Sequence, residues 1–349
     1  MAADSDGPPM IRRGKGLRLS PQTPDGAAPA ETPAPTAESA QPAIRRKGLR
    51  LSTQVREGAS LVPPRSAPPA SAQRRIATPH GAFSYLVAGT GPPLIMLHGW
   101  GASAQLWGDT LTTLADLRTI YACDLPGFGA SPARAAVPTL ATLADEVLAF
   151  ADAMGLTRFD LLGHALGAAV AACVAGRHQG RVGSLIVTSL GARIFAPALT
   201  ALDLSRPPFD LTMGLARPLF DLWQPLNRVM MQSQPVALTL EALLLHDGPR
   251  NSELWRGYLA DHAAADTRAY VTALTAVGDP ALHAALRAIS APTLCIAGRE
   301  DHIAHLAEST VAHTLIAGSR LHILDHCGHM PMLEQPEAFH HTVREFLTA

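Results

Sequence analysis

The chain has 349 residues, of which 47% are hydrophobic and 16% charged, so it is long enough to build an ample core. Its net charge of −1 hides an asymmetry, because residues 1–75 carry a net charge of +6 and the remainder −7. A basic segment joined to an acidic body suggests that this segment meets a partner of its own. No apolar run reaches the roughly 18–20 residues that span a bilayer. We therefore expect no transmembrane segment, no secretory signal and a cytoplasmic location.

The four cysteines form no close pair and show no Cys/His spacing typical of a metal site. We expect free thiols in a reducing compartment, no bound metal and no cofactor.

Residues 1–75 are rich in Ala, Pro, Ser and Gln and lack hydrophobic periodicity, which predicts a disordered tail. The tail contains a repeat, IRRGKGLRLS at 11–20 and IRRKGLRLS at 44–52, with a weaker echo, QRRI, at 73–76. It is either duplicated low-complexity sequence or a tandem motif that binds a protein groove or an anionic surface with raised avidity. Because the tail has no aromatic residue, specific nucleic-acid binding is not expected.

From about residue 80 onward, short apolar runs alternate with helical patterns, which predicts a mostly parallel sheet covered on both faces. The predicted strands are 82–87, 94–97, 119–123, 159–162, 185–188, 293–297 and 321–324. The predicted helices are 139–154, 165–178, about 303–315 and 336–347.

Residues 191–278 interrupt this alternation with seven prolines among short helical stretches, and they predict a helical cap inserted into a core of residues 76–190 and 279–349. Met and aromatic residues gather in this insertion, so we expect an apolar pocket there. They are Met213, Met230, Met231, Trp223, Trp255 and Tyr258.

Five short motifs follow predicted strands, in an order that is specific when they are taken together. They are His98-Gly99-Trp100-Gly101, Asp124-Leu125-Pro126-Gly127-Phe128-Gly129, Gly163-His164-Ala165-Leu166-Gly167, Gly298-Arg299-Glu300-Asp301 and Cys327-Gly328-His329-Met330-Pro331.

With these motifs, residues 80–349 resemble the α/β-hydrolase superfamily, whose nucleophile turn reads G-x-S-x-G and whose triad runs Ser, Asp, His. The resemblance implies an α/β fold with an eight-stranded sheet and a helical cap after the sixth strand. The nucleophile position holds Ala165, and alanine cannot attack a carbonyl group. Locally, GHALG resembles the aminoacrylate hydrolase-like proteins of pyrimidine degradation, which also have alanine there.

The resemblance also implies roles for other residues. Asp301 would orient and stabilise the imidazole of His329, which would act as the base. An oxyanion would be held at the loop of Gly99 and Trp100, by the backbone N–H groups of Trp100 and Leu166.

Other polar residues near these motifs are expected to serve the fold. Ser103 would cap the following helix, Cys327 would pack its loop, and His164 would be a structural or a surface group. Asp124 and Ser189 follow strands and could border the pocket, but neither lies on the turn that carries the nucleophile.

Three hypotheses fit Ala165. The first, which we favour, is an enzyme in which a His329–Asp301 dyad activates water, or moves a proton, on a small, largely apolar carbonyl or imine-type substrate. The second is an inactive binding or scaffold module recruited through its repeated tail motif. The third is an ordinary serine esterase in which alanine has replaced the serine.

Overall fold

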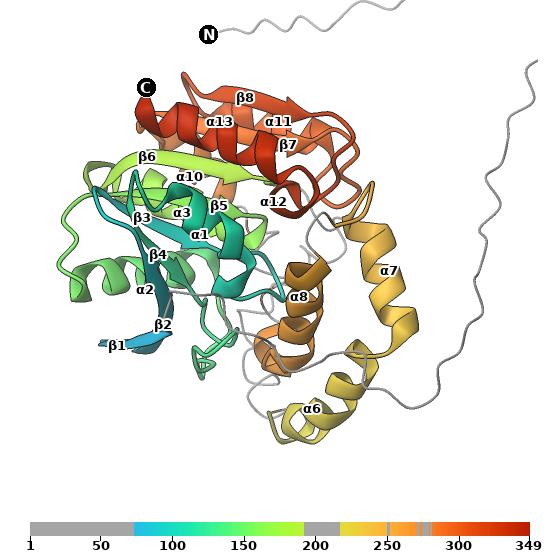
Figure 1. Ribbon diagram of the computed structural model, residues 1–349. Helices are drawn as coiled ribbons and strands as arrows, with labels where there is room; N and C mark the ends of the chain where they lie inside the picture. Colours follow the sequence, from blue (N-terminus) through green and yellow to red (C-terminus); the bar gives the residue numbers. More distant parts are fainter. Residues whose placement is uncertain (1–72, 192–216, 250–251, 271–272, 274–278, 280) are drawn as a thin grey trace, which may run out of the picture. The chain divides into compact units, whose positions relative to one another are not determined.

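The computed structural model describes residues 73–191, 217–249, 252–270, 273, 279 and 281–349 (Figure 1). The tail with its two repeats lies outside the described residues, as does Met213 of the expected cap. The description below concerns the second of the two units of the chain, Gly58–Ala349.

Eight strands form one sheet in the order β1-β2-β4-β3-β5-β6-β7-β8. The pairs β1–β2 and β2–β4 are antiparallel, and every other neighbouring pair is parallel, which confirms the mostly parallel sheet expected from the sequence. The strands are β1 (Arg74–Thr78), β2 (Gly81–Ala88), β3 (Pro93–Leu97), β4 (Thr119–Cys123), β5 (Phe159–His164), β6 (Val182–Thr188), β7 (Thr293–Gly298) and β8 (Arg320–Leu324).

Strand β1 was not predicted, and it places Arg74 and Arg75, which the sequence assigned to the disordered tail, in the sheet. Arg74 to Thr78 pair with Tyr85 to Gly81 of β2 in an antiparallel hairpin. The strand is mostly exposed, so its residues lack the apolar run by which the buried strands were recognised.

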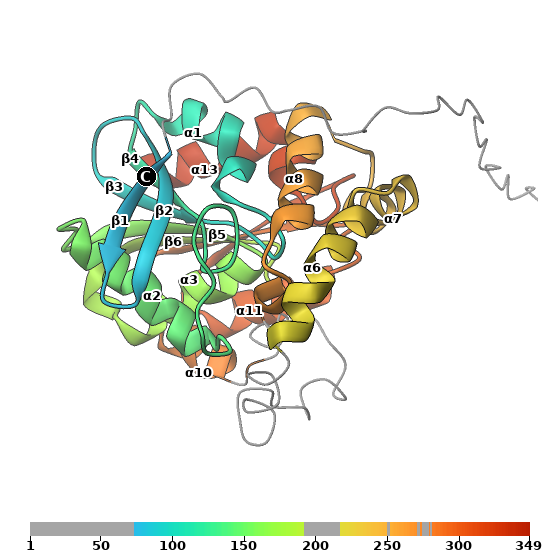
Figure 2. The ribbon, with the colours of Figure 1, turned by 90° about the horizontal axis from the view of Figure 1, so that it is seen from below.

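Alternate residues along each central strand face two separate cores, as the pleat requires. On β3, Ile95 and Leu97 belong to one core, and Leu94 and Met96 belong to the other. Helices α2, α3, α10 and α11 contribute to the first core, and α1 and α13 contribute to the second. Both faces of the sheet are therefore covered (Figures 1 and 2).

The described helices of the core span segments in which apolar residues recur at helical spacing. They are α1 (Gly108–Leu114), α2 (Leu140–Ala153), α3 (Leu166–Arg177), α10 (Ala281–Ala288), α11 (Leu306–Leu315), α12 (Pro331–Glu334) and α13 (Pro336–Thr348), with 3-10 turns at η1 (Ala104–Trp107) and η2 (Gln179–Arg181).

Between β6 and β7 the structure places α6 (Arg217–Met231), α7 (Gln234–Leu244) and α8 (Ser252–Ala264). These helices lie together at one side of the sheet (Figures 1 and 2). Helical structure thus occupies the interval where the sequence predicted a cap. We call α6, α7 and α8 the cap helices.

Candidate active site

The turn between β5 and α3 holds Ala165 in a strained backbone conformation. Its φ of 48° and ψ of −110° are unusual for a residue with a β-carbon. A β-carbon on Gly163 would overlap the carbonyl oxygen of Gly167, and one on Gly167 would overlap that of Leu97. The glycines are therefore required by the close packing of α3 against β5 and β3. A sharp strand-to-helix turn of this kind presents its central side chain at a helix N-terminus.

His329 and Asp301 form a buried pair on the loops that follow β8 and β7. The Nδ1 atom of His329 lies 2.9 Å from Oδ2 and 3.1 Å from Oδ1 of Asp301. Both side chains are almost fully buried. Because Asp301 accepts from Nδ1–H, the other ring nitrogen, Nε2, is left as the basic atom of the imidazole.

The Asp301 carboxylate is held in its charged form. Burial raises the pKa of Asp301, but the His329 imidazole and the backbone N–H groups of Ala304 and Ile303 lower it, and its net position is below the ordinary value. Both N–H groups donate to Oδ1 at 2.8 Å. The carboxylate therefore stays ionised and can stabilise an imidazolium.

His164 links the Ala165 turn to the base. Its Nε2–H donates to the carbonyl oxygen of His329 at 2.9 Å, and the two rings lie 5.0 Å apart. Burial, and then the neighbouring His329, lower the pKa of His164 to about 3, so its imidazole is neutral. His164 thus positions the backbone of His329, in agreement with the structural alternative expected for it.

The loop after β3 lies against the same turn. A β-carbon on Gly99 would be 3.4 Å from the β-carbon of Ala165 and 2.5 Å from Nδ1 of His164. His98 fixes this loop: its Nε2 accepts from Leu125 N–H at 2.9 Å, so its Nδ1–H donates to Gly99 O at 2.7 Å. Leu166 opens α3, and its N–H has no acceptor within the helix. Gly99 and Leu166 therefore lie beside Ala165, and the oxyanion role of Leu166 and Trp100 stays a prediction.

His262 on cap helix α8 is a residue that sequence reasoning missed. Its ring lies against Gly101, where a β-carbon would overlap it, and contacts the rings of Trp100, Tyr258 and Tyr270. Burial lowers its pKa to about 3, and within the described residues neither ring nitrogen has a hydrogen-bond partner. A single histidine in a helical sequence does not indicate that its side chain will contact a distant loop.

The cap is hydrogen-bonded to the loop that carries the base. His329 N–H donates to the carbonyl oxygen of Leu244 at 2.8 Å, and His246 N–H donates to Oε2 of Glu334 at 2.6 Å. The same buried Glu334 carboxylate accepts from Gly328 N–H and Met330 N–H. The chain that leaves α7 is therefore bonded directly to His329 and, through the Glu334 carboxylate, to the residues on either side of it.

The structure separates the remaining predicted polar residues by what they bind. Ser103 accepts from Gln105 N–H as an N-cap, as expected, and its hydroxyl also donates to Asp261 of α8 at 2.5 Å. Asp124 accepts from the backbone N–H groups of Ala104 at 2.7 Å and Ala130 at 2.9 Å, so it holds loops in place.

Ser189 and Cys327 are both buried. Ser189 has a positive φ of 51°, and its hydroxyl has no hydrogen-bond partner among the described residues. It follows β6, beside the Thr188 carbonyl that accepts from Ala165 N–H at 3.0 Å. Burial raises the pKa of Cys327 well above the ordinary value, as suits a thiol that packs its loop.

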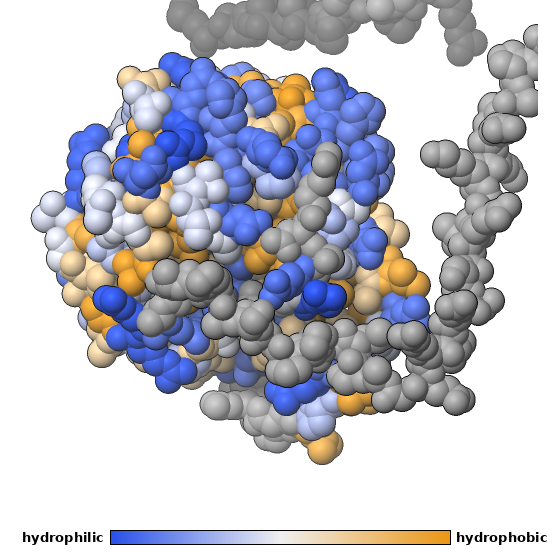
Figure 3. Space-filling view, in the orientation of Figure 1, coloured by the Kyte–Doolittle hydropathy of each residue, from blue (hydrophilic) through white to orange (hydrophobic). Residues whose placement is uncertain are grey.

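The apolar residues expected to line a cap pocket divide into two groups. Trp255 and Tyr258 of α8 are buried and their rings stack, whereas Trp223 and Met230 of α6 are 49% and 42% exposed. Hydrophobic surface also shows over α7 (Figure 3). A cavity of about 320 Å³ lies elsewhere, lined by segments around Pro126, Arg134 and Ala269, and includes neither member of the dyad. Trp223 and Met230 are therefore about half open to solvent, and the apolar pocket expected in this interval stays a prediction.

Comparison with known proteins decides the family, because residues 94–342 match the sequence profile described as "Alpha/beta hydrolase family". The chain belongs to the α/β-hydrolase family. It is 29% identical over 260 residues to a pimeloyl-[acyl-carrier protein] methyl ester esterase of Aeromonas hydrophila, covering 74% of this chain and 96% of the relative. It is 28% identical to a 2-hydroxymuconate semialdehyde hydrolase of a Pseudomonas species, covering 74% and 88%.

The crystal structure of a hydrolase from Pseudomonas aeruginosa matches this α/β-hydrolase with a TM-score of 0.64 and 25% identity, covering 79% of this chain and 98% of that one. The proteins similar to this chain include esterases and other hydrolases, which supports a hydrolase-like protein. Among the described residues, none of the helices is both long and apolar enough to traverse a lipid bilayer.

Proposed function

We propose that this α/β-hydrolase is an enzyme that uses the His329–Asp301 dyad without a serine nucleophile. The observation that carries the proposal is the buried dyad itself, with Nδ1 bonded to Asp301 and Nε2 left as the base. A methyl group at residue 165 offers no oxygen to bond with a substrate. The attacking oxygen would therefore come from water.

In this mechanism, Nε2 of His329 removes a proton from water, and the resulting hydroxide attacks the electrophilic carbon of the substrate. The charge that develops on the substrate oxygen is held by backbone N–H groups of Trp100 and Leu166. The imidazolium is stabilised by Asp301 and then returns its proton to the leaving group. The same base could instead abstract a substrate proton.

The substrate we propose is small and largely apolar, with a carbonyl or imine-type centre. The partly buried Trp100 and the buried Tyr258 and Tyr270 around His262 support an apolar environment close to the Gly99–Gly101 loop. Relatives named as an ester hydrolase and a semialdehyde hydrolase support carbonyl chemistry at such a site. Reactive substrates suit a dyad, because oxyanion stabilisation and binding alone retain about 10³–10⁴-fold catalysis over water.

Turnover on a panel of short acyl esters, lactones and enamine-type substrates tests the proposal. We expect activity in the unmodified protein and a loss of about 10²–10⁴-fold in His329→Ala, since that is the usual contribution of general acid–base catalysis. Ser189→Ala, which removes the nearby buried hydroxyl, should leave turnover unchanged. Covalent serine-hydrolase probes should not label the unmodified protein, and labelling at any residue in the pocket would contradict the proposal.

Ala165→Ser separates the proposal from its two alternatives. Activity only in Ala165→Ser would identify an ordinary serine esterase that lacks its nucleophile. The absence of turnover in all variants would favour a binding or scaffold module recruited through the repeated tail motif. We retain, as a separate proposal, that this basic tail binds a protein groove or an anionic surface.

A further inference from the structure

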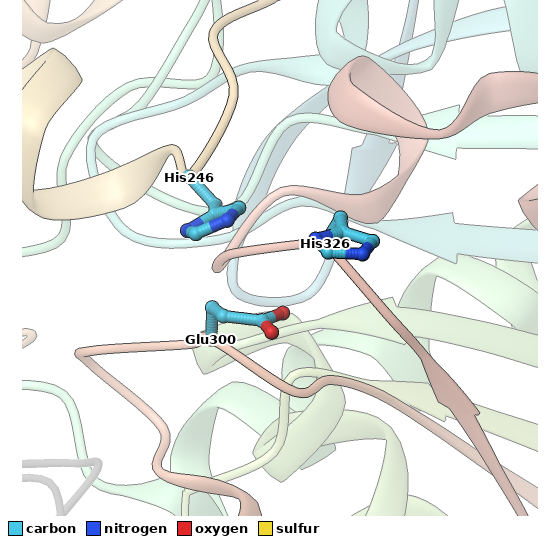
Figure 4. A group of neighbouring side chains, drawn as sticks. All are labelled: His246, Glu300 and His326. Carbon is cyan, nitrogen blue, oxygen red and sulfur yellow. The ribbon is translucent and has the colours of Figure 1, made fainter. Parts of the chain in front are cut away.

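We propose that His246, Glu300 and His326 form a site for a borderline-soft divalent cation such as Zn²⁺, which joins the cap to the two loops of the dyad. One potential ligand atom from each residue lies within 4.8 Å of the other two. His246 follows α7, Glu300 follows β7 and His326 follows β8. Figure 4 shows the three side chains converging from these separate segments.

The donor set favours zinc over magnesium or calcium. Two imidazoles and one carboxylate are a combination that binds zinc and leaves a fourth position for water or a ligand. Magnesium and calcium prefer shells made of oxygen atoms. The Asp247 carboxylate lies 3.7 Å from Nε2 of His246, which adds negative charge beside the same imidazole. The local charge therefore also favours a cation.

The distances between the three ligand atoms need only a small adjustment to fit a zinc ion. Ligand atoms around a tetrahedral zinc ion lie about 3.4 Å apart, given zinc–ligand distances of about 2.0–2.1 Å. Both histidines are exposed and Glu300 is partly buried, so rotation of the exposed imidazoles can close the gap without moving the core. Glu300 is already anchored, since its Oε2 accepts from Cys327 N–H at 3.1 Å and its own N–H donates to Cys327 O at 3.0 Å.

The position of the site gives the cation a mechanical role. Glu300 directly precedes Asp301, and His326 lies three residues before His329. His246 follows cap helix α7, and its N–H donates to Glu334. A cation held by all three side chains would add a link between the cap and both loops that carry the dyad, and would slow their local opening.

Titration of Zn²⁺ into the chelator-treated full chain, followed by calorimetry and thermal unfolding, tests the site. We expect one Zn²⁺ per chain, a raised melting temperature and no comparable effect of Mg²⁺. His246→Ala, Glu300→Gln and His326→Asn should each weaken Zn²⁺ binding by at least about 100-fold, beyond the 10–100-fold typical of residues that only support a ligand. Glutamine keeps an acceptor for Cys327 N–H, and asparagine tolerates the positive φ of residue 326.

His341→Ala is the matched control, because His341 is exposed on α13 and is not one of the three proposed ligands. It should bind Zn²⁺ as the unmodified protein does. Unchanged affinity in Glu300→Gln or His326→Asn, or an equal loss in His341→Ala, would overturn the site. Hydrogen exchange gives a second readout: Zn²⁺ should slow exchange of residues 244–249 in the unmodified protein and not in His246→Ala. Equal slowing in both would overturn the link to the cap.

Discussion

The loops that follow β3 and β4 and those that follow β7 and β8 contain the same kinds of buried polar side chain, but use them differently. In the first pair, His98 and Asp124 bind backbone atoms, and each nitrogen of His98 is engaged. In the second pair, His329 and Asp301 bind each other, which leaves one imidazole nitrogen for chemistry. A buried His or Asp after a strand therefore acquires its role from its partner, and not from its position alone.

The largest expected effect is the loss of turnover when the contact between His329 and Asp301 is broken. Asp301→Asn should lower kcat by about 10²–10⁴-fold, as His329→Ala does, because an amide can favour the wrong imidazole tautomer and cannot stabilise the imidazolium. Steady-state kinetics measure this effect. The measurement should be repeated in an Ala165→Ser background, which gives a signal even if the unmodified protein proves inactive. Near-normal turnover in both backgrounds would remove Asp301 from the active site.

Disrupting the loops after β3 and β4 should instead lower the stability of the fold. Asp124→Ala should lower the free energy of unfolding by about 2–4 kcal/mol, because the backbone N–H groups of Ala104 and Ala130 lose a buried charged acceptor. Urea denaturation measures it, with Asp124→Asn as the control that keeps one acceptor and should lose less. If Asp124→Ala instead lost turnover while keeping its stability, the distinction between the two loop pairs would be wrong.

Acid should destabilise the protein through its buried neutral histidines. Below about pH 6.5 the unfolded chain protonates His164 and His262, whereas the folded protein resists until about pH 3. Their contribution is therefore complete above pH 6.5 and is lost as the pH falls, by about 1.4 kcal/mol per pH unit for each histidine. His262→Leu should reduce the slope of unfolding free energy against pH by about that amount. An unchanged slope would mean that His262 is solvated.

The smallest expected effect is at the contact between the loop after β3 and the cap. Ser103→Ala should cost about 1 kcal/mol, because it removes an N-cap and the hydrogen bond to Asp261. Thermal unfolding measures the change, and Thr310→Ala on the exposed face of α11 is a control expected to have little effect. A loss as large as that of Asp124→Ala would show that the cap contact, and not the Asp124 network, holds this loop.

Most of the sheet could be predicted because buried parallel strands are short apolar runs. Strand β4 was predicted with its observed bounds, and β3 and β7 to within one residue at each end. Strand β1 was missed since an exposed edge hairpin needs no apolar run. Exposure likewise could not be predicted for Trp223, because helical spacing alone does not say which face of α6 is covered.

The sequence predicted only those site residues that belong to one of the short motifs. The order of the motifs indicated Ala165, Asp301 and His329, and the structure brings the last two into contact. His262 has no motif, and it reaches the Gly99–Gly101 loop from a cap helix far along the chain. The His246, Glu300 and His326 cluster was also invisible to a search for short spacings, because its members come from three separate segments.

The hydrogen bonds that join Leu244 to His329 and His246 to Glu334 have a consequence for the backbone of the base. Movement of α7 that kept both bonds would leave this backbone in place, whereas unfolding of residues 244–246 would release it. The register of the imidazole thus depends on the end of α7 as well as on Asp301 and His164.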